Sequence, residues 1–246
     1  MPDSSSVYLW CARLNMLLGG LALVSGRGAW AKGVWTASGI CWAVQAAAFA
    51  ADTGLSSLSG VAPTFGLAAV VLYLCQAANL NPDFRAGRCR PRITAVFLIL
   101  LAWGSVLPES LRHNSFMTAY VFAVLFFLSR PLSLGTTLFA LAGIADVLPG
   151  KNDAGMMAAS KRWAFLAAMI FLGGEIAGCY WGFAGWGTTW RWSGNFYFSA
   201  MVFVLYMVAL HVPGSLFPSP RSRAYGFFLP LAVIAGATAL SKVMNL

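Results

Sequence analysis

Residues 163–182 of this chain read Trp163-Ala-Phe-Leu-Ala-Ala-Met-Ile-Phe-Leu-Gly-Gly-Glu-Ile-Ala-Gly-Cys-Tyr-Trp-Gly182, with a single charged side chain, Glu175. A helix of this length covers the roughly 30 Å hydrocarbon core of a bilayer. Lipid offers no hydrogen-bond partner to open backbone groups, so a segment of this composition must be helical where it crosses. The stretch therefore predicts a transmembrane helix.

Seven further apolar runs surround this one. The eight runs lie at residues 7–25, 34–51, 62–81, 93–107, 116–147, 163–182, 197–213 and 225–242. Charged residues make up only 9% of the 246 residues, against about 25% in a soluble domain, so the chain cannot cover a water-facing surface. We predict an all-α polytopic transmembrane helical bundle of about eight spans. Residues 1–246 then form a single transmembrane domain with no separate soluble domain.

The fifth run is too long for one perpendicular span. Its residues 116–147 would reach about 48 Å as a helix, against a core of about 30 Å. Pro131 lies near its middle and should kink or break a helix there. We favour one long, kinked helix that projects from the membrane, and two short re-entrant pieces are the alternative.

The basic residues gather on one side of the predicted bundle. Eleven of them fall in loops on the first side: Arg27, Lys32, Arg85, Arg88, Arg90, Arg92, Lys151, Lys161, Arg162, Arg221 and Arg223. Only Arg112, Arg191 and Lys242 fall on the other. The positive-inside rule makes the first side cytoplasmic, which places a multi-pass protein in the cytoplasmic (inner) membrane with both termini outside. The net charge of +9 is explained by this orientation, without nucleic acid as a partner.

The cysteines show no spacing typical of a metal site, a covalent haem attachment or a redox pair. They are read as small apolar packing residues: Cys11, Cys41, Cys75, Cys89 and Cys179. Glycines on the sixth run, at positions 173, 174 and 178, would allow close helix packing. No Ser-His-Asp grouping or phosphate-binding loop is present, so the chain is more typical of a non-enzyme.

A tryptophan-rich segment follows the sixth run. It reads Trp181-Gly-Phe-Ala-Gly-Trp186-Gly-Thr-Thr-Trp190-Arg191-Trp192, and we expect it to form the outer loop between the sixth and seventh spans. Tryptophans at a membrane surface are often a plain aromatic belt. Here they are concentrated in one segment and interleaved with glycines, which let a backbone approach a flat ligand closely. A shelf for an apolar macrocycle is the second interpretation.

Within this segment, Trp186-Gly187-x-x-Trp190-x-Trp192 resembles the tryptophan-rich WWD signature of the CcsA/CcmC-type cytochrome c assembly proteins. Gly178-x-x-Trp181 falls at the register of a family Gly-x-x-Trp, and the seventh run ends in Ala209-Leu210-His211 at the distance of a family histidine. The resemblance is strongest over residues 156–211.

The resemblance implies a haem-handling protein of cytochrome c biogenesis that uses haem b. His211 would bind haem iron inside the membrane, since a neutral imidazole is a good iron ligand. The segment carrying Trp181, Trp186, Gly187, Trp190 and Trp192 would present haem at the outer face. Implied partners are a second membrane subunit and an apocytochrome c or haem chaperone. Participation in holocytochrome c synthesis is a family property that the residues do not themselves indicate.

The chain departs from the family pattern at three places. Ser193 stands where the family has an aspartate, and the charged residues after it are missing. Two outer histidines that serve the family as axial ligands are also absent: Tyr120 occupies one position, and Leu240-Ser241 the other. Tyr120 could ligate ferric haem as a phenolate, and His113 could substitute for it from the outer loop. The alternative function is therefore a haem-free structural or anchoring subunit with the same fold.

Two arginines are further candidates. Arg130 lies mid-run before Pro131, where an unpaired cation costs several kcal/mol. Its partner could be a haem propionate, Glu175 or Asp146, unless the run breaks and lets it reach an interface. Arg191 could contact a propionate or remain a solvated loop charge.

Overall fold

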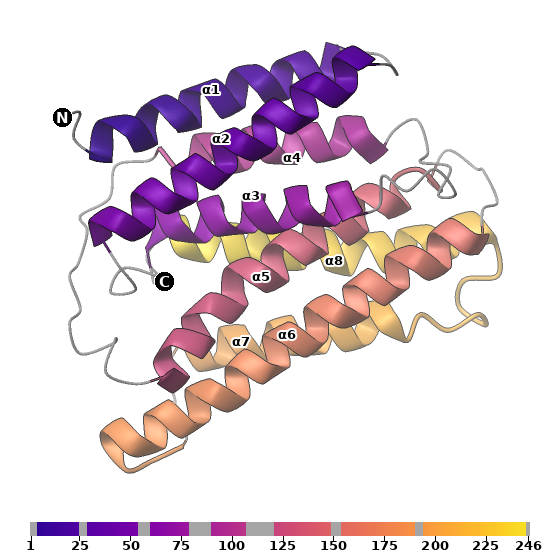
Figure 1. Ribbon diagram of the computed structural model, residues 1–246. Helices are drawn as coiled ribbons and strands as arrows, with labels where there is room; N and C mark the ends of the chain where they lie inside the picture. Colours follow the sequence, from indigo (N-terminus) through magenta and orange to yellow (C-terminus); the bar gives the residue numbers. More distant parts are fainter. Residues whose placement is uncertain are drawn as a thin grey trace. The chain divides into compact units, whose positions relative to one another are not determined.

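A computed structural model describes residues 4–24, 29–53, 60–78, 90–106, 121–148, 154–189 and 194–244. The described residues are helical with short turns and contain no strand. The chain divides into two compact units, residues 1–119 and 120–246, and the described residues of each form four helices (Figure 1). The single transmembrane domain expected for residues 1–246 stays a prediction.

The first unit is a ring of four helices in which each packs against the next and α4 packs against α1. Its helices are α1 (Ser4–Val24), α2 (Ala29–Thr53), α3 (Val61–Ala78) and α4 (Arg90–Gly104). A buried chain of side-chain hydrogen bonds joins α1, α2 and the turn that follows α4: Asn15 Nδ2 donates to Gln45 Oε1 at 3.1 Å, and Gln45 Nε2 donates to Ser105 Oγ at 3.2 Å. Polar groups that face a bundle interior satisfy one another because lipid cannot.

The second unit repeats this arrangement. Its helices are α5 (Val121–Ile144), α6 (Ala154–Trp186), α7 (Gly194–Leu210) and α8 (Pro220–Val243). Helix α5 packs against α6 and α8, and α7 packs between α6 and α8. Helix α8 begins with a capping box, in which Ser219 Oγ accepts from the backbone N–H of Ser222 at 3.0 Å and Pro220 occupies the first turn.

The predicted fold class is confirmed, because a helix covers the position of every predicted span. Five of the described helices are long and apolar enough to cross a membrane, namely α1, α3, α5, α6 and α8, and α7 is a shorter apolar helix. Helix α5 runs through Pro131 as a single 24-residue helix, so the two-piece alternative is wrong. Helix α6 is the longest of the described helices, and its 33 residues reach about 50 Å. Whether the fifth helix projects from the membrane stays a prediction.

Helices α5 and α6 approach closely because α6 presents glycine to α5. A Cβ on Gly174 would collide with the side chain of Ser129, and one on Gly178 would lie 2.6 Å from the ring of Phe126. Where α5 ends and α6 begins, a Cβ on Gly143 would collide with Ser160 Oγ. Two of the glycines predicted to permit close packing therefore do so, whereas Gly173 has open space where its Cβ would stand.

We expect Gly174→Ala to destabilise the protein by about 1–3 kcal/mol, because the added methyl overpacks the α5–α6 contact. The matched control is Gly173→Ala, one position away with no atom in the way, which should be neutral or stabilising by up to about 1 kcal/mol through helix propensity. The free energy of unfolding in mixed detergent measures both. Equal effects of the two substitutions would contradict the close contact.

Candidate functional site

The tryptophan-rich segment begins as helix, not as loop. Trp181 and Trp186 both lie in α6, which ends where Gly187 adopts a positive φ of 73° and its N–H donates to Phe183 O at 2.9 Å. A glycine in the left-handed region is a common helix stop. The prediction that residues 181–186 form a loop is therefore wrong, since Gly182 and Gly185 are accommodated within the helix.

Trp181 packs into the protein, while Trp186 does not. The Trp181 ring lies 6.2 Å from that of Phe126, 5.8 Å from that of Phe127 and 5.2 Å from that of Trp186, measured between centroids. Trp186 is 56% exposed. We call the end of the second unit where α6 stops and α7 starts the aromatic end. Among the described residues of the aromatic end, Trp186 has the accessible indole, and the ring of Trp181 packs against it.

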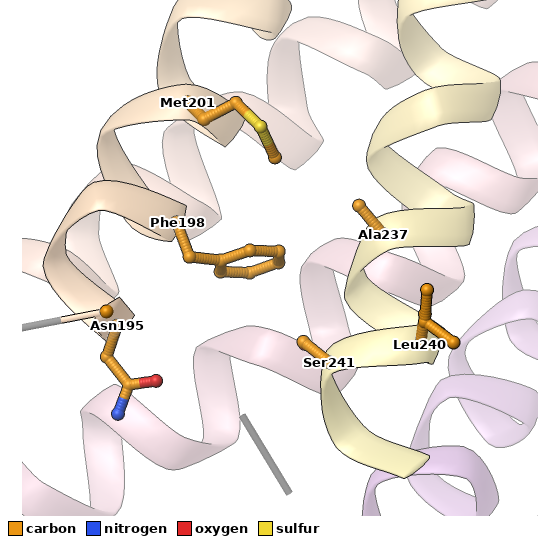
Figure 2. A pocket seen from close by; sticks show the side chains of 7 residues that line it. Asn195, Phe198, Met201, Ala237, Leu240 and Ser241 are labelled. Atoms are coloured by element: carbon orange, nitrogen blue, oxygen red, sulfur yellow. The ribbon is translucent and has the colours of Figure 1, made fainter. Parts of the chain in front are cut away.

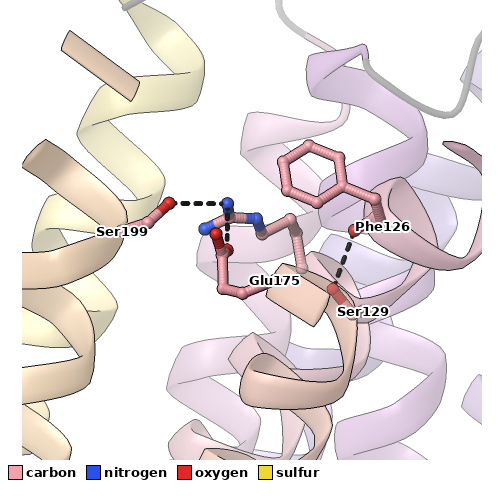
Figure 3. A network of polar contacts seen from close by, with 5 residues as sticks. Phe126, Ser129, Glu175 and Ser199 are labelled. Carbon is pink, nitrogen blue, oxygen red and sulfur yellow. Dashed lines mark hydrogen bonds and ion pairs between the residues drawn. The ribbon is translucent and has the colours of Figure 1, made fainter. Parts of the chain in front are cut away.

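An ion pair lies between α5, α6 and α7, as Figure 3 shows, with its arginine buried and its glutamate half-buried. Arg130 Nη2 is 2.5 Å from Glu175 Oε1 and donates to Ser199 Oγ at 3.0 Å. The guanidinium carbon lies 4.8 Å from the ring centre of Phe126 and 4.7 Å from that of Phe171. Arg130 is only 8% exposed. Of the partners considered from the sequence, Glu175 is the one that the structure pairs with this cation.

A second polar cluster joins α7 to α5, at positions that follow Arg130 along α5. The hydroxyl of Tyr206, 1% exposed, lies 2.8 Å from Ser133 Oγ and 2.6 Å from Thr137 Oγ1. Ser133 Oγ also donates to Ala167 O of α6 at 3.0 Å. Hydrogen-bonded groups of this kind fix the relative rotation of three helices, since a turn of any one would leave a buried group unsatisfied.

His211 follows the last residue of α7, at the end of the unit opposite the aromatic end. Its side chain is exposed, and its Nδ1 lies 2.9 Å from the carbonyl oxygen of Met207. A carbonyl can only accept, so Nδ1 carries the proton of the neutral ring, and Nε2 holds a free lone pair. No group in the described part of the chain bonds Nε2. The loop after His211 is held to α8 by Arg223, whose Nε donates to Phe217 O at 2.9 Å.

The aromatic end and His211 are separated by the whole of α7. Its 17 residues span about 25 Å, which approaches the thickness of a hydrocarbon core. One flat macrocycle cannot touch both ends. If both parts act on the same ligand, they do so at separate positions.

Sequence reasoning missed a pocket at the aromatic end, between the start of α7 and the end of α8. Its volume is about 500 Å³, and Figure 2 shows Phe198 and Met201 of α7 facing Ala237 and Leu240 of α8. Gly194, Asn195 and Ser241 complete the lining. Ligand pockets are commonly of this size and mostly apolar. The segment at 240–241, where the resembled family has an axial histidine, thus forms part of the pocket wall.

Several predicted site residues fall outside the described residues. These are Tyr120, His113, Trp190, Arg191 and Trp192. Their roles stay predictions. Within the described ranges, no three His, Cys, Asp or Glu side chains gather as a metal site.

The fold of this chain is similar to that of a protein of known structure. The solved structure that shows this is the cytochrome c haem lyase CcmF, with a TM-score of 0.70 and 14% sequence identity over 97% of this chain. The chain spans 45% of the length of that protein. No protein-family model and no curated protein sequence matches the chain.

We expect removal of one partner of the Arg130–Glu175 pair to cost about 3–5 kcal/mol of stability, because a buried charge is left uncompensated. Arg130→Met and Glu175→Gln should each show this loss. The double variant should lose much less than the sum of the two. The free energies of unfolding in mixed detergent form the double-mutant cycle, and additive losses would contradict a direct pair.

Proposed function

We propose that the chain is a haem-handling membrane protein of cytochrome c biogenesis, in which His211 binds the iron of haem b and the tryptophan-rich segment presents haem at the outer face. The observation that carries this proposal is the hydrogen bond from His211 Nδ1 to Met207 O. Histidines that ligate metals usually donate their other ring N–H to a carbonyl or carboxylate in this way. The bond selects the tautomer and the ring orientation that a ligand needs.

His211 also satisfies the other requirements of an axial ligand. Its side chain is exposed, so Nε2 can be reached from outside the four-helix unit. A neutral imidazole is among the common ligands of haem iron. Arg223 ties the loop that follows His211 to α8, which limits how far the imidazole can swing. Haem bound there would supply the redox-active iron, and the chain would hold it in place.

The aromatic end contributes apolar contact rather than ligation. Trp186 is exposed there, and the pocket walls are Phe198, Met201, Ala237 and Leu240. Such surfaces suit the faces of a macrocycle. The ion pair of Arg130 with Glu175 already compensates this cation's charge, so Arg130 supports the helices beneath the surface. A propionate would instead be met by Arg191, as the sequence suggests.

The positive-inside bias orients the proposed activity. It places the aromatic end and both chain termini outside and His211 near the cytoplasmic face. An apocytochrome c or a haem chaperone would dock at the aromatic end from outside the membrane, beside a second membrane subunit. The fold shared with the cytochrome c haem lyase CcmF supports this class of partner.

The packing of Trp181 favours a second candidate function. Its ring lies against Phe126, Phe127 and Trp186, so this indole already has the protein's own side chains as neighbours. A haem-free structural or anchoring subunit would keep such packing and need no iron ligand. The two functions differ in one measurable property, the presence of bound haem.

The test is the absorption spectrum of protein purified from haem-replete cells. We expect a b-type spectrum that His211→Ala abolishes, because Nε2 is the proposed ligand, and that added imidazole restores by entering the vacated position. The companion variant is His113→Ala, which removes the chain's other histidine. A spectrum that it leaves unchanged assigns ligation to His211 alone, and a spectrum that it alters would assign a second ligand to His113. Absence of haem from the unaltered protein would instead support the structural subunit.

A further inference from the structure

Two cysteines meet in the first unit, away from the proposed haem site. Cys41 of α2 is buried, with 6% exposure, and its Sγ lies 3.2 Å from the carbonyl oxygen of Cys11 in α1. The Cys41 side chain therefore lies against Cys11 across the contact between α1 and α2. No sequence pattern indicates this contact, because the two residues are 30 positions apart and belong to different helices.

The position of these thiols suits a covalent link. A disulfide requires Cα atoms about 4.4–6.8 Å apart with side chains directed at each other. Helices α1 and α2 are packed neighbours, and Sγ of Cys41 already reaches the backbone of Cys11. Cys179 on α6 is also half-buried, and it provides an internal comparison.

We propose that Cys11 and Cys41 are a dithiol site that forms an intramolecular disulfide by exchange with a small apolar disulfide. The Cys11 thiolate attacks one sulfur of the reagent, forming a mixed disulfide and expelling the first thiolate. The Cys41 thiolate then attacks Cys11 Sγ, forming the Cys11–Cys41 bond and expelling the second. Two cysteine thiols are oxidised, one reagent disulfide is reduced, and both thiol protons pass to the leaving thiolates.

Exposure assigns the order of attack. Cys11 is half-buried and lies two turns from the start of α1, whereas Cys41 is buried behind it. The reagent therefore meets Cys11 first, and Cys41 resolves the adduct. The co-reactant must be apolar, because both cysteines lie in apolar runs, 7–25 and 34–51, that the sequence predicts to cross the membrane.

The experiment treats the full-length protein in detergent with dithiodipyridine and maps the peptides by mass spectrometry without reduction. We expect a linked Cys11–Cys41 peptide pair and release of two pyridinethione molecules for each link. Where Cys179 reacts, we expect it to keep one thiopyridyl adduct instead of forming a link. Cys75→Ser should leave the link unchanged.

Cys11→Ser and Cys41→Ser separate the roles. Each should abolish the linked peptide, and Cys41→Ser should leave a stable adduct on Cys11. The proposal is overturned if unaltered protein carries separate adducts on both cysteines. It is equally overturned if neither cysteine forms the link while the protein remains folded. Neither outcome bears on haem binding, because the site lies in the first unit and His211 in the second.

Discussion

The ion pair between Arg130 and Glu175 is the interaction on which the second unit depends. A cation inside a membrane bundle is tolerated only when a partner compensates it, and here the partner is on the adjacent helix, with Ser199 on a third. Gly174, one residue before Glu175, lets α5 approach closely enough for the pair to form. The ion pair and the packing at Gly174 thus stabilise the same contact, the one between α5 and α6. That contact positions the end of α6, which carries Trp181 and Trp186.

The geometry separates the two parts of the proposed haem site. A 17-residue helix holds the tryptophan-rich segment at one end and His211 at the other, so the proposed ligation and the proposed presentation would occupy opposite ends of α7. Ligation needs one directed lone pair, which the bond from His211 Nδ1 to Met207 O leaves on Nε2. Presentation needs apolar surface, which Trp186 and the pocket beside Phe198 provide. Neither end alone would both hold and display a macrocycle.

The spans could be predicted because hydropathy is a property of contiguous sequence. The end of α6 could not, because Gly182, Gly185 and Gly187 look alike in sequence, and only Gly187 takes a positive φ. The choice among partners for Arg130 also needed the structure, since pairing depends on helix rotation. The pocket is lined by residues 194–201 and 237–241. These two segments are far apart in sequence, and the hydrophobic pattern of one segment does not show which other segment packs beside it.

The central claim is that His211 holds haem iron, and the most direct measurement is electron paramagnetic resonance of the purified protein at low temperature. In a His113→Ala background, His211 is the sole histidine, so an isotopic label on histidine nitrogen reports on this residue alone. The account predicts a haem iron signal whose nitrogen coupling changes with the label. A haem signal indifferent to the label would contradict it, as would protein from haem-replete cells that contains no iron signal.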